Sequence, residues 1–421
     1  MLKGILERAL LVCAGIVFAL ITAEGLVYVG YWAILGHRFP GADYRSAMLE
    51  RTGAASAQPQ MHRPGEDDRG AVPMVIHPYL GFVPAPGQIT GGTTIGDPLQ
   101  IPPQSDRELN VGVFGGSFAA GLCAYAKTEL RRVLAPPGKD VRVLCMTAGG
   151  YKQPQQLLAL AYLLAQGAHF DLVLNVDGFN EVSLPAVENE PQGVAPIYPR
   201  AWFWRVGDLE DPDALKLLGE LSVTDRDRRS WAKTFVHWGL DRSALLTQVW
   251  ASRDRLFDVE RNQILTELRD HKIEQRKSYA ATGPTMTFAD DESRYAYLAR
   301  LWRDSSLQMK LLCDGNGIAY DHFLQPNQYV EGSKPMGPEE LRETIRPGPY
   351  SRGVVGGYPH LRREGEELVR AGLKFHDLTM VFKDVQERLY KDGCCHLTGP
   401  GYIRIARVIG ESVRAERKLV P

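Results

Sequence analysis

The sequence predicts an α/β protein that is built on a parallel sheet and begins with a membrane-spanning helix. Short apolar runs alternate with helical stretches between residues 109 and 182, and the alternation resumes after residue 293. A long apolar stretch precedes both regions. Strand–helix–strand repeats at this spacing are typical of a right-handed parallel sheet that is buried on both faces.

Residues 1–36 are predicted to be the membrane anchor. The span Ala9–Leu35 contains 27 residues, no Lys or Arg and one charged residue, Glu24. About 20 residues are enough to cross a bilayer, whereas the apolar region of a signal peptide has about 7–15. A signal peptide cleaved after Thr22-Ala23 remains the alternative.

The flanks of this span predict its orientation. Lys3 and Arg8 precede it, and Tyr31 and Trp32 near its end suit a membrane–water interface. We therefore expect the remaining chain outside the cytoplasm, in the periplasm or the extracellular space.

The remaining chain divides into four parts. Residues 37–108 are expected to form a tether and lead-in segment, 109–182 the first part of the α/β core, 183–292 a mostly helical insertion, and 293–421 the second part of the core. The predicted strands are Leu109–Phe114, Val141–Met146, Leu172–Val176, Ile318–Leu324 and an apolar run Leu373–Phe382, and the predicted helices are Phe118–Leu134, Pro154–Gln166, Tyr295–Cys313, 361–371 and Tyr402–Val413.

Composition excludes some classes of function. The chain is 44% hydrophobic and 24% charged with a net charge of −1, which gives no electrostatic case for nucleic acid. Its six cysteines include no Cys-x-x-Cys pair, so we expect no metal site and no cofactor. The pairing of the cysteines stays open at this point.

Ser117 is the candidate nucleophile. It lies in Val111-Gly-Val-Phe-Gly-Gly-Ser-Phe-Ala-Ala-Gly121, where an apolar strand runs into two glycines and then into small residues that can begin a helix. A hydroxyl at a helix N-terminus can attack a substrate, and the backbone N–H groups there can stabilise the resulting anion. Gly-Gly-Ser also occurs in ordinary tight turns.

A serine hydroxyl needs a base, and His396 is the candidate. It lies in Lys391-Asp-Gly-Cys-Cys-His-Leu-Thr-Gly-Pro-Gly-Tyr402, four residues after Asp392. One turn of chain can hold such a carboxylate against the imidazole and orient it. An Asp-x-x-x-His pair alone is a common pattern.

Two further segments offer donors for an oxyanion. Asn180 follows the buried strand at 172–176, and Gly149-Gly150 follows the strand at 141–146. Active sites of open α/β sheets gather at the carboxyl ends of the strands. The alternatives are an Asx-turn at Asn180 and a simple turn at the glycines.

Together these four segments resemble the SGNH (GDSL-type) hydrolase family. Its Ser, Gly, Asn and His blocks match in order at Ser117, Gly150 (or Gly149), Asn180 and His396, the last with Asp392. The resemblance implies a flavodoxin-like three-layer α/β/α fold. It also implies an acyl-serine mechanism in which the N–H groups of Ser117 and Gly150 and the Asn180 amide hold the oxyanion.

The sequence departs from the family pattern at two places. Gly116 stands where the family has Asp, which is expected to loosen the turn. The usual Asp-x-x-His spacing is one residue longer, because both Cys394 and Cys395 intervene. Two alternatives follow: Asp392 is displaced and a backbone carbonyl supports His396, or a disulfide from this pair to Cys123 or Cys145 braces the loop.

The expected function is a membrane-anchored, extracytoplasmic serine esterase that acts on an ester-bearing envelope substrate, either a glycan or a lipid. The alternatives are an acyltransferase that modifies an envelope polysaccharide with the same site and a non-catalytic glycan-binding or assembly protein that retains the fold. The oligomeric state stays open.

Overall fold

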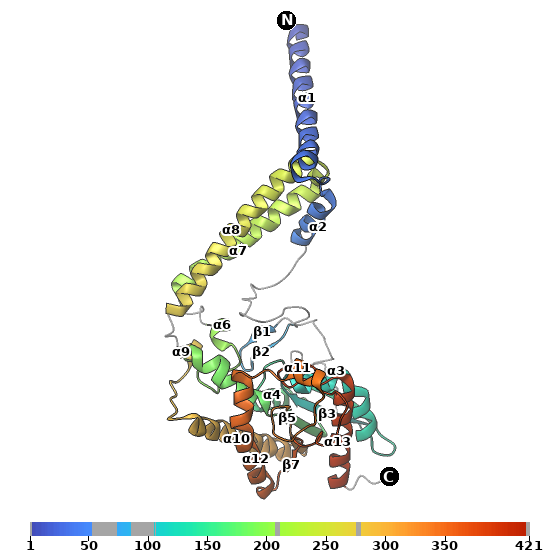
Figure 1. Cartoon of the computed structure of the whole chain (residues 1–421), viewed down its shortest axis with the longest axis vertical. Helices are drawn as coiled ribbons and strands as arrows, with labels where there is room; N and C mark the ends of the chain where they lie inside the picture. Colours follow the sequence, from blue (N-terminus) through green and yellow to red (C-terminus); the bar gives the residue numbers. More distant parts are fainter. Residues whose placement is uncertain are drawn as a thin grey trace. The chain divides into compact units, whose positions relative to one another are not determined.

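The computed structural model describes residues 2–52, 74–85, 105, 107–206, 211–274 and 279–417. The chain divides into two compact units, one of Met1–Met61 with Asp208–Gln275 and one of His62–Gly207 with Arg276–Pro421 (Figure 1). Much of the predicted tether, at 53–73, 86–104 and 106, lies outside the described residues.

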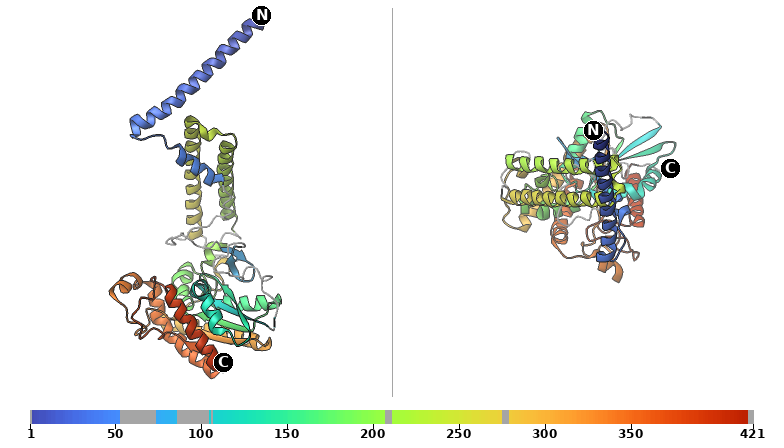
Figure 2. Two further views of the ribbon diagram at one scale, coloured as in Figure 1. Left: turned by 90° about the vertical axis from the view of Figure 1, so that its right-hand side faces the viewer. Right: turned by 90° about the horizontal axis from the view of Figure 1, so that it is seen from above.

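The first unit is helical. It contains α1 (Leu2–Leu35), α2 (Gly41–Thr52), α7 (Pro212–His237), a short 3-10 turn η4 (Leu240–Arg242) and α8 (Ala244–Glu274). Figure 2 shows α7 and α8 running side by side as a hairpin. Met48 of α2 packs with Phe235 and Trp250 of the hairpin.

Helix α1 is long and apolar enough to cross a membrane. Its segment Leu10–Leu35 has a mean hydropathy of 2.4. Its apolar side chains, such as Leu10, Phe18 and Ile21, are exposed. In water this surface would be unfavourable, so composition and exposure both favour a membrane anchor.

The second unit contains a five-stranded sheet in the order β4-β3-β5-β6-β7, with every neighbouring pair parallel. The strands are β3 (Glu108–Gly115), β4 (Asp140–Thr147), β5 (Leu172–Asp177), β6 (Ala319–Leu324) and β7 (Lys374–Asp377). Strand order reverses between β3 and β5, and ligand sites of open parallel sheets lie at such a switch point.

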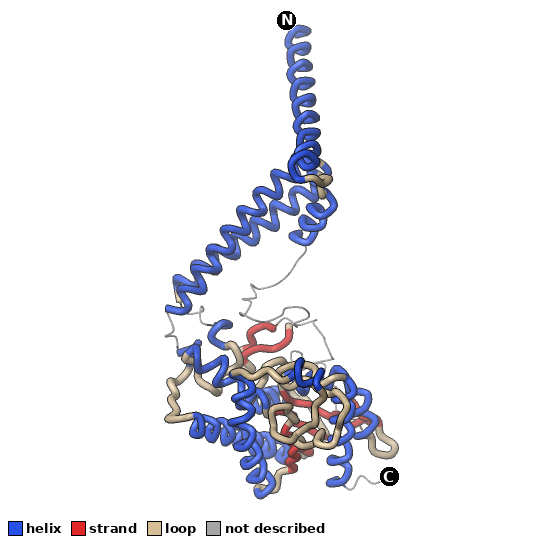
Figure 3. The backbone as a smooth tube through the Cα atoms, viewed as in Figure 1, coloured by secondary structure: helices blue, strands red, loops and turns tan. Residues whose placement is uncertain are grey.

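Helices cover both faces of this sheet, as the helix and strand colours of Figure 3 show. One apolar cluster joins one face to α3 (Ser117–Leu134) and α13 (Gly399–Arg417). The other cluster joins the opposite face to α4 (Gln155–Ala165), α10 (Asp291–Gly315) and α12 (Pro349–Arg370). Burial on both faces explains why the strands read as continuous apolar runs.

Shorter elements complete the unit. They are β1 (Met74–His77), β2 (Gly81–Pro84), α5 (Phe179–Leu184), η2 (Pro185–Asn189), η3 (Glu190–Gln192), α6 (Trp202–Val206), α9 (Tyr279–Thr282) and α11 (Pro338–Thr344).

The predicted α/β class and its parallel sheet are confirmed, with differences in detail. The apolar run Leu373–Phe382 forms a strand only over Lys374–Asp377, and the helix expected at 361–371 already begins at Pro349. The expected insertion at 183–292 is divided: its long helices belong to the first unit, whereas 183–206 and 279–292 belong to the second.

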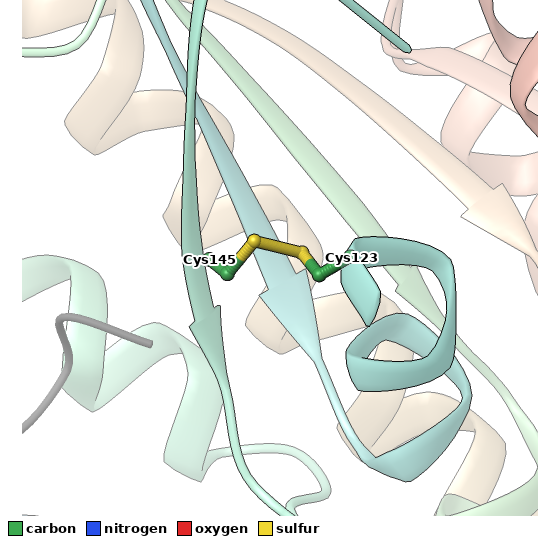
Figure 4. The surroundings of a disulfide bond; sticks show 2 residues. All are labelled: Cys123 and Cys145. Carbon is green, nitrogen blue, oxygen red and sulfur yellow. A yellow bond between two sulfur atoms is a disulfide. The ribbon is translucent and has the colours of Figure 1, made fainter. Parts of the chain in front are cut away.

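A disulfide joins Cys123 of α3 to Cys145 of β4 (Figure 4). The expectation that Cys394 or Cys395 pairs with one of these residues is therefore wrong, and both remain free thiols. Cys123 and Cys145 lie in the same apolar cluster between α3 and the sheet, which brings their Cα atoms within 6.3 Å. The bond links the helix that carries Ser117 to the edge strand.

Candidate active site

Ser117 lies where β3 ends and α3 begins. Gly116 is the N-cap of α3 and Ser117 its first residue. The first N–H groups of a helix have no partner within the helix, and the aligned peptide dipoles make this end positive. The Ser117 hydroxyl is thus placed where backbone donors are available for an anion.

Three side chains form a continuous hydrogen-bonded relay. His396 Nε2 lies 2.8 Å from Ser117 Oγ, and His396 Nδ1 lies 2.6 Å from Asp392 Oδ2. Both distances are within the range required for proton transfer. In this arrangement Nδ1–H donates to the carboxylate, which leaves Nε2 free to accept the serine proton.

The extra residue before His396 is accommodated by a turn around Asp392. Its Oδ1 accepts hydrogen bonds from the N–H groups of Cys394 (3.0 Å), Cys395 (3.2 Å) and His396 (3.3 Å). The other oxygen of the carboxylate remains available for the imidazole. Asp392 is therefore not displaced, and a carboxylate rather than a backbone carbonyl supports His396.

The same contacts set the charge state of Asp392. Burial alone would raise the pKa of this carboxyl, but the hydrogen bond from His396, its charge and the backbone N–H groups of Cys394 and His396 outweigh burial and lower the pKa. The carboxylate consequently stays ionised in weakly acidic solution.

Asn180 is oriented by a backbone carbonyl. Its Nδ2 donates to Tyr151 O at 2.7 Å, and the residue is 9% exposed. Because a carbonyl oxygen only accepts, the amide must present its NH₂ group to it. One hydrogen of that group is used by Tyr151 and the second remains for a substrate oxygen.

Close packing explains the glycine at position 116. A Cβ atom there would lie 2.2 Å from Asn180 Nδ2 and 2.9 Å from Tyr151 O. The Asp of the family pattern does not fit beside the amide in this arrangement. Gly116 therefore belongs to a tightly packed turn, and the expectation of a loosened turn is wrong.

The structure distinguishes Gly150 from Gly149. Gly150 has φ +82°, and a Cβ there would meet Arg200 Cδ at 2.3 Å, whereas a Cβ on Gly149 would meet nothing within 4 Å. Gly150 immediately precedes Tyr151, whose carbonyl holds Asn180. Of the two glycines, Gly150 is the one whose backbone conformation requires glycine.

A buried polar network surrounds Asp177, three residues before Asn180 in the chain. Asp177, at the end of β5, accepts hydrogen bonds from Trp302 Nε1 (2.6 Å) and Asn175 Nδ2 (2.8 Å) and contacts His322 Nε2 at 2.8 Å. His322 Nδ1 lies 2.7 Å from Ser306 Oγ. Sequence reasoning missed this network, although two polar residues inside the apolar strand β5 were a visible signal.

Glu181 links the two oxyanion segments. Its carboxyl accepts hydrogen bonds from Gly178 N (2.8 Å) and Gln153 N (3.2 Å). Burial and the nearby charge of Asp177 raise the pKa of Glu181 to about 8. Burial lowers the pKa of neighbouring Lys152 to about 7, against the opposing effect of Glu181 and Glu188.

The relay residues overlap one group with metal-ligand chemistry. The Sγ atoms of Cys394 and Cys395 and a ring nitrogen of His396 lie within 4.8 Å of one another. Both nitrogens of His396 already face Asp392 and Ser117. A metal held there would compete with the relay, so the arrangement fits proton transfer better.

The site offers a nucleophile, a base, an orienting carboxylate and an amide donor at the carboxyl edge of a parallel sheet. Comparison with known protein families and with curated proteins gives no match for the chain. The geometry and chemistry of these residues thus carry the assignment that follows.

Proposed function

We propose that this chain is a membrane-anchored serine esterase of the SGNH type. The observation that carries the proposal is the relay from Ser117 through His396 to Asp392, with distances of 2.8 and 2.6 Å. A serine hydroxyl in ordinary surroundings is a weak nucleophile, and a relay of this kind is the usual way to activate it.

In the proposed reaction Ser117 Oγ attacks the ester carbonyl while His396 Nε2 takes the hydroxyl proton. The carbonyl oxygen becomes an anion, and the N–H groups of Ser117 and Gly150 and the Asn180 amide stabilise it. The tetrahedral intermediate collapses, and His396 protonates the leaving alcohol. Water, deprotonated by His396, then attacks the acyl-serine and releases the acid together with Ser117.

The exposure of the relay supports water rather than a second alcohol as the acceptor. The side chains of His396 and Asp392 are 24% and 37% exposed, so solvent reaches the base directly. Acyl transfer requires that water be excluded from the acyl-enzyme, and an open relay makes such exclusion difficult.

Two wider features support the family and the location. Counted along the sheet, the strand order is 2-1-3-4-5, the order of flavodoxin-like sheets, and that is the architecture the SGNH resemblance implies. The Cys123–Cys145 disulfide suits an oxidising compartment. With the apolar helix α1, it supports a single-pass anchor that places this unit outside the cytoplasm, close to envelope glycans or lipids.

A fluorophosphonate probe tests the proposal on the full-length chain. Wild type should be labelled at Ser117 and should hydrolyse a short acyl ester, and Ser117→Ala should lose both activities. The chain supplies a matched control in Ser306, which contacts His322 and through it Asp177 but is fully buried. Ser306→Ala should keep both activities, and failure of folded wild type to react would refute the esterase assignment.

A further inference from the structure

Glu24 is an acidic residue inside the apolar helix α1, and it has a specific partner. Its carboxylate accepts hydrogen bonds from Ser243 Oγ (2.6 Å), Ala244 N (2.5 Å) and Leu245 N (3.0 Å). These groups begin the 31-residue helix α8. A carboxylate at this position satisfies free N–H groups and interacts favourably with the positive end of the helix.

Further contacts fix the end of the α7–α8 hairpin to the same part of the chain. Gln248 Nε2 donates to Tyr31 OH at 3.0 Å, and Arg45 of α2 pairs with Asp241 at 3.1 Å. We call residues 233–246 the hairpin tip. It is held against α1 at the level of Glu24.

The length of α1 places this level at the membrane surface. At about 1.5 Å per residue, the helix between Arg8 and Glu24 is about 24 Å long, while the hydrocarbon core of a bilayer is about 30 Å thick. A core of that thickness takes about 20 helical residues, so counted from Arg8 it ends near Tyr28, about four residues beyond Glu24. Glu24, where the hairpin tip is attached, therefore lies within about 6 Å of the outer boundary of the hydrocarbon.

The surface of the hairpin tip suits such a boundary. Trp238 is 72% exposed, and Lys233, His237 and Arg242 are exposed as well. Asp241, the one acidic residue between 233 and 246, has a side chain that is 2% exposed and paired with Arg45. An exposed tryptophan beside uncompensated cations is typical of segments that bind anionic headgroups.

We propose that the hairpin tip is a second membrane-binding element, which places Trp238 among the headgroups of the outer leaflet and Lys233 and Arg242 beside anionic lipid phosphates. The inference rests on the proposed anchoring by α1. It extends that proposal, because α1 and the hairpin then bind the bilayer together through the Glu24 contact.

The test uses full-length protein in bilayers of phosphatidylglycerol and phosphatidylcholine, with bromine on the acyl carbons nearest the headgroup as a quencher of tryptophan emission. Trp32 and Trp238 are the two exposed tryptophans among those whose side chains the structure describes. Trp238→Phe should therefore remove about half of the quenchable emission. Trp250→Phe, at a site 2% exposed in the same hairpin, is the matched control and should leave that emission unchanged.

The lipid charge supplies a second measurement. Quenching of Trp238 should be stronger with phosphatidylglycerol than in pure phosphatidylcholine, and the double variant Lys233→Gln, Arg242→Gln should lose that difference. Equal quenchable emission from wild type and Trp238→Phe would overturn the proposal. Disulfide cross-linking of a Trp238→Cys variant to a second copy, together with no quenching of Trp238 in wild type, would overturn it in favour of a protein contact.

Failure of the anchor itself gives a different result. In that case alkaline carbonate would extract the whole chain from the bilayer and Trp32 would not be quenched either. Labelling of Ser117 by the fluorophosphonate is independent of both outcomes, so the esterase proposal is tested separately.

Discussion

Replacing Gly116 by alanine should disable the oxyanion site while the relay of Ser117 and His396 remains intact. The new Cβ would lie 2.2 Å from Asn180 Nδ2, more than 1 Å inside the 3.4 Å at which ordinary contact begins. Tyr151 O, 2.9 Å from the same Cβ and hydrogen-bonded to that amide, belongs to the backbone and cannot move away easily. The amide of Asn180 must therefore shift by about 1 Å.

A shift of that size takes the Asn180 amide out of hydrogen-bonding distance of the oxyanion. An oxyanion donor has to lie about 2.7–3.1 Å from the anion, and loss of one donor typically costs about 10²–10³ in kcat. We expect Gly116→Ala to lower kcat by this factor. A smaller effect is expected on KM, because the anion forms only in the transition state.

The chain supplies both a control and a consistency check. Gly149→Ala adds the same atom in open space and should keep wild-type kcat. In an Asn180→Ala background the added methyl group no longer meets an amide, so Gly116→Ala should cost much less there than in wild type. Steady-state ester hydrolysis by the four variants and wild type gives all the required rates.

Two results would refute this reasoning. One is wild-type kcat in Gly116→Ala, which would show that Asn180 does not act where the structure places it. The other is equal loss in Gly116→Ala and Gly149→Ala, which would point to backbone flexibility of the two loops rather than to contact with the amide.

Changes at three further sites test the supporting residues. Asp392→Asn should lower kcat by about 10³–10⁴ with little change in Tm, because the amide oxygen still accepts the backbone N–H groups but carries no charge to stabilise protonated His396. Asp392→Ala should lower both kcat and Tm. An unchanged kcat in either variant would contradict the relay. Glu181 has a folded-state pKa of about 8, raised from 4.5, so its stabilising contribution is complete below about pH 4.5 and is lost as the pH rises towards 8. The Tm of wild type should therefore fall over that range relative to Glu181→Gln, and parallel curves would argue against a protonated Glu181. The Cys123–Cys145 bond closes a segment of 22 residues. Its removal by a double Cys→Ala change should lower the free energy of unfolding by about 3 kcal/mol in urea titrations. An unchanged unfolding midpoint would show that the bond does not form.

The sequence predicts the sheet well because the strands are buried on both faces. Apolar runs such as Leu109–Phe114 and Leu172–Val176 lie within β3 and β5 of the structure. The apolar run after Leu373 misleads, since most of its residues pack in loops against the sheet rather than pairing with β6. An apolar run indicates that its residues are buried, but buried residues need not pair in a strand.

Contacts between distant residues were harder to predict. Ser117 and His396 are 279 positions apart, and their proximity was expected from the family resemblance, not from the spacing itself. The pairing of Cys123 with Cys145 depends on α3 lying against β4. The contact of Glu24 with α8 depends on how an inserted hairpin folds back. No local pattern carries that information, because it resides in the packing of whole elements.

The buried polar residues of the second unit have a common role in the site. Asn180 holds Tyr151 O, and Glu181 holds both Gly178 N and Gln153 N. The bonds of Asn180 to Tyr151 and of Glu181 to Gln153 join the turn after β5 to the loop after β4, and the bond to Gly178 N fixes Glu181 within its own turn. The proposed donors Asn180 and Gly150 belong to these two segments. The donors thus cannot move apart independently, which is the preorganisation that stabilisation of an oxyanion requires. Because the Glu181 carboxyl makes two of these bonds, Glu181→Gln should reduce turnover as well as stability, although its side chain reaches neither Ser117 nor His396.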